Sequence, residues 1–427
     1  MRAAHSPARA GPRAPKNVAL AVSALLGLAS ASHAAPRSLV DRSLVRTSVD
    51  LLGWTDESVA YRDSLGRVRQ EPIGRYVAVL PGPRSQGGWA RPADEDLAGG
   101  TPVVIELVDG ERLLGSVGPW ESASVPVPTP ADETVSVLTP GFGASTLPLD
   151  RISRVVIDPW TRGDAPHAFT PSVDDELILA NGDRLRGFLV EFGEQVRFDS
   201  GQAEQTIPLD RVAEVRLGNP AETWQGPRVW WTTGDVRAVH ATGEAPDGEV
   251  AFTDGSGTPP VEFIIGAIEA VWLDGASPIP LAGLPVEHYE PLGGRRWTPP
   301  VRTGSEHDAP LGTPHVALPG PMRVEWLLPP DAAKFGAIAR MGGTLDDPDA
   351  EAGRWANAVL RIGMVNRGEE TEILSVKLDR STPLAPIAVE LPDPGVAGRT
   401  LVVELLPGLY GPIQDRVLLD RPMLTGL

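Results

Sequence analysis

The residues best suited to chemistry are two aromatic side chains with polar neighbours. Trp355 follows Arg354 and stands two positions before Asn357, at the edge of a predicted strand, and Tyr410 lies at the tip of a glycine-flanked loop. An exposed aromatic ring can stack on the C–H face of a sugar while nearby polar groups bind its hydroxyls. Packing in a core is the alternative for both rings. The pattern predicts Trp355, Arg354, Asn357 and Tyr410 as ligand-binding residues.

Other tryptophans are predicted to serve packing. Trp326 lies within an alternating strand and is expected in a core. Trp230 and Trp231 are adjacent, so they face opposite sides of a strand and one of them is expected to be exposed or at a contact between domains.

Catalytic and metal-binding patterns are missing from the sequence. It has no cysteine, no Gly-x-Ser-x-Gly, no His-Glu-x-x-His, no P-loop and no EF-hand loop. His288, His307 and His315 fit no helix face or hairpin spacing, which favours structural or surface roles. We therefore assign no catalytic residue, no metal ligand and no cofactor.

An acidic loop offers oxygen ligands in a flexible segment. It can hold calcium or simply be a solvated charged loop, and the sequence leaves both readings open. The loop comprises Asp346, Asp347, Asp349 and Glu351.

Composition excludes several classes of protein. Glycine (46) and proline (44) are abundant among the 427 residues, which argues against a mainly helical protein because both interrupt helices. A formal net charge of -18 argues against a nucleic-acid partner, since phosphate binding needs clustered cations. The hydrophobic content of 41% suffices for packed cores.

The N-terminal residues 1–34 are typical of a signal peptide. A basic leader without acidic residues precedes the apolar stretch 18–31, and small residues at Ser32 and Ala34 allow cleavage. A retained short anchor is the alternative, although the stretch is shorter than the ~20 residues that span a bilayer. The chain is therefore expected to be exported, to the periplasm, the cell envelope or the outside, with no stable membrane span after cleavage.

Two internal blocks recur in the same order. Residues 109–115 (DGERLLG) match residues 181–187 (NGDRLRG), and residues 147–155 (LPLDRISRV) match residues 207–215 (IPLDRVAEV). The interval from Gly110 to Pro148 is 38 residues and that from Gly182 to Pro208 is 26, so the earlier copy carries a 12-residue insertion, expected near residues 126–130. Asn181-Gly182 favours a type I′ hairpin turn.

Weaker matches extend the repeat to four copies. The predicted copies are residues 45–82, 101–158, 174–218 and 227–274, each with short strands that suit a small, bent β-barrel. The arrangement resembles the tandem SH3- or Sm-like small β-barrel repeats of exported bacterial proteins. This resemblance implies scaffolding or interaction and no chemistry.

The C-terminal residues 285–427, after a linker rich in proline, glycine and serine, read as a β-sandwich. The order of blocks at residues 312–316, 326–329, 335–343, 358–365 and 415–424 resembles the NPCBM family of galactose-binding-like jelly-roll modules. That resemblance implies a jelly roll that binds carbohydrate. In this family a tryptophan is usual where Leu419 stands.

The sequence thus predicts an exported, all-β, non-catalytic protein in which tandem small β-barrels precede a jelly-roll sandwich. The sandwich is expected to bind a glycan or another envelope component. A structural or assembly protein, whose repeats bind other proteins by strand edges or loops, is the alternative. A hydrolase with two facing carboxylates is a third reading.

Overall fold

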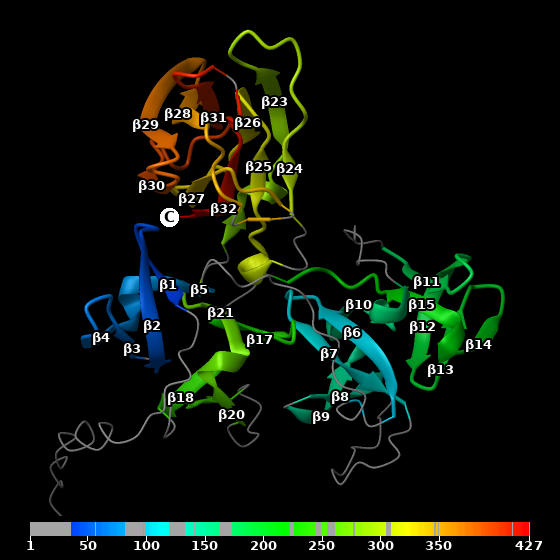
Figure 1. Cartoon of the computed structure of the whole chain (residues 1–427). Helices are drawn as coiled ribbons and strands as arrows, with labels where there is room; N and C mark the ends of the chain where they lie inside the picture. The colour runs from blue at the N-terminus through cyan, green and yellow to red at the C-terminus, as the bar shows by residue number, and fades with distance from the viewer. Residues whose placement is uncertain are drawn as a thin grey trace, which may run out of the picture. The chain divides into compact units, whose positions relative to one another are not determined.

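The chain is all-β, as predicted, with small β repeats followed by a β-sandwich (Figure 1). The structure, a computed structural model, describes residues 36–55, 57–81, 97, 99–118, 133–140, 142–162, 173–222, 226–244, 249–253, 261–275, 278–304, 309–345, 347–348, 350–411 and 413–426, with backbone only for residues 161–162 and for those described within 240–264. The predicted signal peptide, the insertion near residues 126–130, His307, Asp346 and Asp349 lie outside these ranges.

Each repeat is a run of short antiparallel strands with a 3₁₀ turn before the last strand. Repeat 1 comprises β1 (Arg37–Asp41), β2 (Arg46–Trp54), β3 (Ser58–Arg62), β4 (Val68–Pro72), η1 (Ile73–Arg75) and β5 (Tyr76–Leu80). Repeat 2 comprises β6 (Thr101–Leu107), β7 (Arg112–Val117), β8 (Thr134–Thr139), β9 (Gly143–Pro148), η3 (Leu149–Arg151) and β10 (Ile152–Ile157), followed by the short helix α1 (Pro159–Arg162).

Repeats 3 and 4 follow the same plan. Repeat 3 comprises β11 (Asp175–Leu179), β12 (Arg184–Phe192), β13 (Gln195–Asp199), β14 (Glu204–Pro208), η4 (Leu209–Arg211) and β15 (Val212–Arg216). Repeat 4 comprises β16 (Arg228–Trp231), β17 (Val236–Ala238), β18 (His240–Glu244), β19 (Glu249–Thr253), β20 (Val261–Ile264), η6 (Ile265–Ala267) and β21 (Ile268–Trp272).

The turn at Asn181-Gly182 differs from the predicted type I′. Gly182 alone in this turn has a positive φ, of 91°. Its N–H donates to Leu179 O at 2.9 Å, and the N–H of Leu179 donates to Asp183 O at 2.8 Å. This is a three-residue loop in which a type I turn is followed by a left-handed glycine. The type I′ prediction is wrong because it ignored this longer loop, which needs only one left-handed residue.

The same loop opens all four repeats, which fixes where repeat 1 begins. Glycine takes the left-handed position in repeats 2, 3 and 4, whereas repeat 1 has Leu44 there, with φ of 62°. One backbone bond, from the residue after the opening strand to the end of the 3₁₀ turn, recurs in all four: Arg42–Arg75, Val108–Arg151, Ala180–Arg211 and Thr232–Ala267. Repeat 1 therefore starts at β1, ahead of residue 45. The turn could not be recognised when the repeats were aligned by sequence, because Leu44 replaces the glycine of the other repeats.

The glycine that ends the repeated block is required by a close approach between strands. A Cβ atom on Gly115 would lie 2.3 Å from Leu138 O, and one on Gly187 would lie 2.0 Å from Asp199 O. Any side chain at Gly115 or Gly187 would push the third strand off the second, so in repeats 2 and 3 this position accepts only glycine.

The repeats pair through two kinds of strand contact. In the closing-strand contact, β5 pairs with β21 (Val79↔Val271) and β10 pairs with β15 (Val155↔Val215). In the second-strand contact, β7 pairs with β17 (Val236↔Arg112). The contacts therefore link the repeats in the order 1–4–2–3. This order differs from the order of the repeats along the chain, because repeat 1 pairs with repeat 4.

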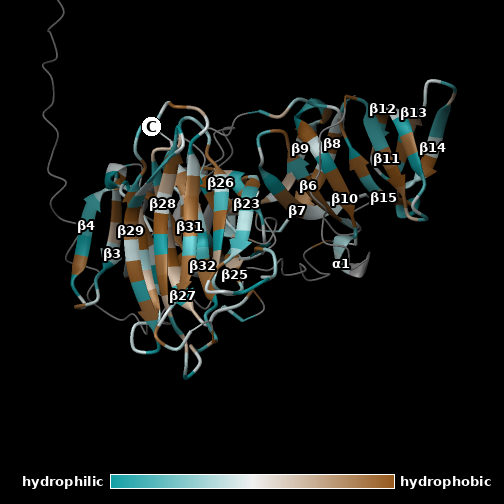
Figure 2. Cartoon of the chain, turned by 90° about the horizontal axis from the view of Figure 1, so that it is seen from above, coloured by the Kyte–Doolittle hydropathy of each residue, from teal (hydrophilic) through white to brown (hydrophobic). Residues whose placement is uncertain are grey.

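The C-terminal sandwich has two antiparallel sheets. One sheet contains β24 (Arg302–Thr303), β25 (Val316–Leu318), β32 (Val417–Thr425), β27 (Lys334–Met341) and β30 (Leu384–Glu390), with β22 (Ile279–Pro280) added beside β32. The other contains β23 (Val286–Pro291), β26 (Met322–Leu327), β31 (Thr400–Pro407), β28 (Asn357–Asn366) and β29 (Glu369–Asp379). Hydrophobic and hydrophilic bands alternate along β28, β29 and β31 (Figure 2), as a half-buried sheet requires.

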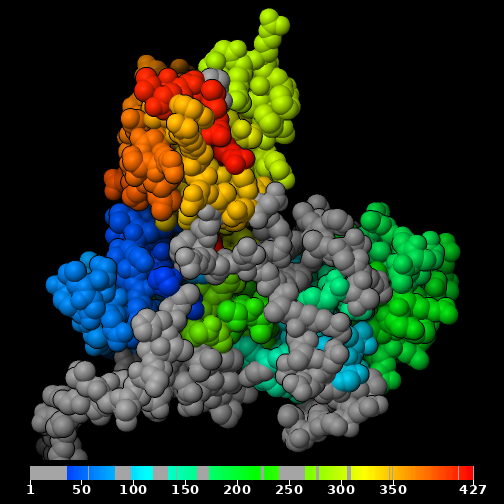
Figure 3. All heavy atoms as spheres, in the orientation of Figure 1, coloured from blue at the N-terminus to red at the C-terminus, as the bar shows by residue number. Residues whose placement is uncertain are grey.

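The sandwich core is continuous and includes Trp326, as expected. Repeats 1 and 4 share a second apolar cluster with the sandwich, in which Leu44 and Trp230 join Leu311 and Met423. Both adjacent tryptophans are buried, and Trp230 lies at this contact between domains while Trp231 packs inside the repeats. Figure 3 shows the repeats and the sandwich with all heavy atoms as spheres.

Candidate functional site

The two predicted aromatic residues meet at one end of the sandwich. The connection from β27 to β28 carries Trp355, and the connection from β31 to β32 carries Tyr410. Because β27 pairs with β32 and β28 with β31, these two connections leave the same end of the sheets. The rings contact edge to face, with centroids 5.4 Å apart and planes at 75°.

This aromatic pair is open to solvent. Trp355 and Tyr410 are 44% and 49% exposed. The Arg354 guanidinium lies 5.0 Å from the centre of the Trp355 ring, a cation–π distance. Leu409 and Ile413 are exposed on the same β31–β32 connection. The surface therefore offers aromatic faces, aliphatic groups and one cationic donor.

Two buried polar residues, Asn357 and Asp415, and the exposed Gln414 hold the two connections together. The Asn357 side chain is buried, and its Oδ1 accepts the N–H of Leu409 at 3.0 Å while its backbone oxygen accepts the N–H of Gly408 at 2.8 Å. Asp415 Oδ1 accepts the N–H of Asn357 at 3.1 Å, and Gln414 Oε1 accepts the N–H of Trp355 at 3.2 Å. Asn357 thus positions the aromatic pair, whereas Arg354, Trp355 and Tyr410 face the solvent.

Asp415 is the carboxylate of this site. Burial raises its pKa, while the N–H groups of Asn357 and Gly408 and the charge of Arg295 act in the opposite direction. The loop after β23, which carries Arg295, lies close to the end of β31, since a Cβ on Gly293 would lie 2.8 Å from the Pro407 ring. Sequence reasoning missed Gln414, Asp415 and Arg295, because polar residues in loops gave no pattern that links distant segments.

The four predicted ligand-binding residues therefore cluster in the structure, although their roles differ. Arg354, Trp355 and Tyr410 can contact a ligand directly by stacking and by donating hydrogen bonds. These groups can bind and orient a molecule with a flat apolar face and hydroxyl groups.

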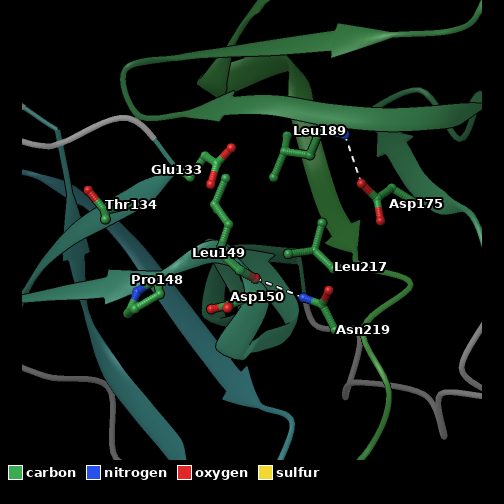
Figure 4. A pocket seen from close by; sticks show the side chains of 9 residues that line it. All are labelled: Glu133, Thr134, Pro148, Leu149, Asp150, Asp175, Leu189, Leu217 and Asn219. Atoms are coloured by element: carbon green, nitrogen blue, oxygen red, sulfur yellow. Dashed lines mark hydrogen bonds between the residues drawn. The ribbon is translucent and has the colours of Figure 1, made fainter.

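A separate hollow of about 410 Å³ lies between repeats 2 and 3 (Figure 4). Asp175 accepts the N–H groups of Leu189 and Gly218, each at 2.8 Å, and Asn219 donates to Leu149 O and Ile152 O at 2.8 and 2.7 Å. Asp175 therefore stabilises repeat 3 itself, whereas Asn219 joins repeat 3 to repeat 2. The remaining walls are Glu133, Thr134, Pro148, Leu149, Asp150, Leu189 and Leu217.

The described histidines contact other residues than the aromatic pair, whereas the acidic loop lies on the same β27–β28 connection as Trp355. His288 is 3.8 Å from Glu290 on β23, and His315 Nδ1 is 3.2 Å from Asp420. In the acidic loop the N–H of Asp347 donates to Thr344 Oγ1 at 3.0 Å. Within the described ranges, no three His, Asp or Glu side chains gather in a way that would hold a metal ion.

Among the residues that the structure describes, no helix is both long enough and apolar enough to cross a bilayer.

Comparisons with known proteins give weak likenesses. No family model and no curated protein matches the sequence. Two solved structures of the CBM51-2 and INT domains of ZmpB from Clostridium perfringens, one in complex with GlcNAc, are 10% and 11% identical, with TM-scores of 0.25 and 0.26. Each match covers 44% of this chain and 40% of that chain, so the match spans about two fifths of their length.

A third likeness is to the insecticidal delta-endotoxin Cry8Ea1 of Bacillus thuringiensis. It is 10% identical, has a TM-score of 0.19, and covers 77% of this chain and 52% of that one. Scores this low leave the functional argument to the chain's own residues.

Proposed function

We propose that this chain is an exported, non-catalytic binding protein whose sandwich binds carbohydrate at the Trp355–Tyr410 pair. The observation that supports this most strongly is two half-exposed rings in edge-to-face contact, on loops that are locked by buried polar groups. Aromatic side chains at a fixed angle form a rigid corner, and a rigid corner loses little conformational entropy on binding.

The chemistry of the corner suits a sugar ring. One ring stacks on the apolar C–H face, and the Arg354 guanidinium donates to ring hydroxyls. The side-chain oxygens of three further residues, Asn357, Gln414 and Asp415, accept hydrogen bonds from backbone N–H groups. These residues position the two aromatic rings. Binding by stacking and hydrogen bonds needs no covalent step. This agrees with the sequence, which contains none of the catalytic motifs considered above.

A glycan array probed with the full chain tests this proposal. Saturable binding to a defined set of glycans is expected, with loss of signal in Trp355→Ala and Tyr410→Ala. Tyr289→Ala is the matched control, because Tyr289 is 46% exposed on β23, almost the same as Tyr410. Absence of binding by a folded chain, or equal loss in the control, would remove the proposal.

A further inference from the structure

The second-strand contact between repeats 2 and 4 is symmetric in its chemistry. Arg112 and Val236, which face each other, occupy the same position of their repeats. The N–H of Leu114 donates to Asp235 Oδ1 at 3.0 Å. The equivalent N–H of repeat 4, on Ala238, donates to the Glu111 carboxylate. Each repeat therefore supplies one acid from its turn and one N–H from its second strand, as in an isologous contact.

Repeats 2 and 4 each use both of their contact strands. Repeat 2 pairs through β10 and β7, and repeat 4 through β21 and β17. In repeat 1 the second strand contacts the sandwich, since Arg46, which is equivalent to Arg112, donates to Arg421 O at 2.7 Å. Repeat 3 pairs through β15 alone, and no residue in the described part of the chain pairs with the outer edge of β12 before Phe188.

The uncovered edge of repeat 3 keeps the groups that the second-strand contact uses. Asp183 stands where repeats 2 and 4 have Glu111 and Asp235, and Arg184 stands where repeat 2 has Arg112. The N–H of Arg186 corresponds to that of Leu114. Asp183, Arg184 and Arg186 are exposed, and the side chains of Arg184 and Arg186 are 59% and 76% accessible. Strands β12, β13 and β14 lie side by side in Figures 1 and 2.

We propose that two copies of this chain pair through β12 of repeat 3, with the geometry of the β7–β17 contact. Arg184 then faces Arg184 of the second copy, and the N–H of Arg186 donates to Asp183 of the second copy. The same bond forms in the reverse direction. The occupant is a second copy because the contact inside the chain shows that two repeats of this sequence are complementary at this edge.

Charges of both signs lie at this edge. Two arginines that meet across a two-fold axis repel each other, so the symmetric pairing needs carboxylates beside them. In the proposed dimer each Arg184 also meets Asp183 of the second copy, so the charges alternate. Glu176 lies 3.4 Å from Arg184 in the same chain and further balances the arginines.

Phe188 is a large apolar side chain beside the uncovered edge. It is exposed on the same face of β12 as Arg184 and Arg186. The spheres of repeat 3 form part of the visible surface in Figure 3. A second copy on β12 would shield this ring from water.

A single engineered cysteine gives a direct test, since the natural chain has none. Arg184→Cys lies on the proposed axis, where facing Cα atoms come within disulfide range. The full chain with this substitution is expected to form a covalent dimer under mild oxidation. Asp210→Cys, on the exposed 3₁₀ turn of the same repeat, is the matched control and should form no disulfide-linked dimer, because its position lies away from the axis.

Sedimentation of the cysteine-free chain gives the second readout. Asp183→Asn removes the charged acceptor from both bonds, so the dimer dissociation constant should rise about tenfold for each, or about 100-fold together. Asp210→Asn should leave it unchanged. A chain that stays monomeric at all concentrations, or a folded Arg184→Cys variant that cross-links no faster than Asp210→Cys, would overturn the proposal.

Discussion

Repeats 1 and 4 form one closing-strand pair, and repeats 2 and 3 form another. The two pairs have the same strand register, but the outer surface is apolar in the first and charged in the second. Ala78 faces Trp272 in the first pair, and at the equivalent positions Arg154 faces Arg216 in the second. The outer surface of the first pair is apolar and packs on the sandwich through Leu311 and Met423.

The second pair carries a network of ion pairs on the equivalent surface. Arg154 lies 2.7 Å from Glu214 and 3.7 Å from Glu106, and Arg216 lies 2.6 Å from Glu214 and 3.3 Å from Glu176. Strand pairing and surface chemistry are therefore separable. The same pairing occurs in both pairs of repeats, and the outward-facing residues determine which pair packs on the sandwich.

The largest effect is expected from the tryptophan at the centre of the apolar surface. Trp272→Ala should lower the free energy of unfolding by about 3–5 kcal/mol, because it leaves a large cavity at a fully buried site. Arg216→Ala, at the equivalent position of the other pair, should cost about 1 kcal/mol. Urea unfolding of both variants measures the contrast, and equal losses would contradict it.

At Leu44, substitution by glycine is expected to destabilise the protein less than substitution by alanine, the reverse of the usual order. Its buried side chain packs on Gly336 of the sandwich, so its loss should cost about 2–5 kcal/mol in Leu44→Ala. Leu44→Gly should be less harmful by about 1 kcal/mol, since glycine accepts the positive φ without strain. Thermal unfolding compares the two variants, and an alanine variant more stable than the glycine variant would show that no strain is stored there.

Acid should weaken the contact between repeat 1 and the sandwich. Burial acts to raise the pKa of Asp420, but the charges of Arg421 and Arg46 and the hydrogen bond from His315 outweigh it and hold the pKa well below its usual range. A lowered pKa stabilises the fold above the unfolded value of about 3.9, and this contribution is lost as pH falls through the folded pKa.

Unfolding from pH 6 down to pH 2.5 measures this effect. Asp420→Asn should be less stable than the natural chain at pH 6, and the gap should shrink as pH falls below about 4. A gap that does not change with pH would show that Asp420 contributes no charge interaction there.

The smallest effect is expected at a residue of the repeated motif. Arg151 is half-exposed and pairs with Asp109 at 3.1 Å, so Arg151→Ala should change the free energy of unfolding by less than about 1 kcal/mol. Urea unfolding checks this, and a loss above 2 kcal/mol would mean that the pair is shielded from solvent.

Much of the fold was predictable from local sequence. Short alternating strands predicted the all-β class, and the two motif blocks located repeats 2 and 3. The start of repeat 1 was not predictable because Leu44 replaces the glycine that marks the turn elsewhere. The strand pairs that join β22 to β32, or repeat 4 to repeat 2, depend on contacts between distant segments, which no local pattern records.

The candidate site was predictable only in its aromatic members. Trp355 and Tyr410 are of types that suit carbohydrate, and their spacing left open whether they meet. The residues that bring them together, Gln414 and Asp415, are ordinary polar loop residues whose role appears only when β27 pairs with β32.

Calorimetric titration of the full chain with the glycan of strongest array signal tests the central claim most directly. Saturable binding with one site per chain is expected, weakened at least tenfold in Trp355→Ala and unchanged in Tyr289→Ala. Unchanged affinity in a folded Trp355→Ala variant would contradict it.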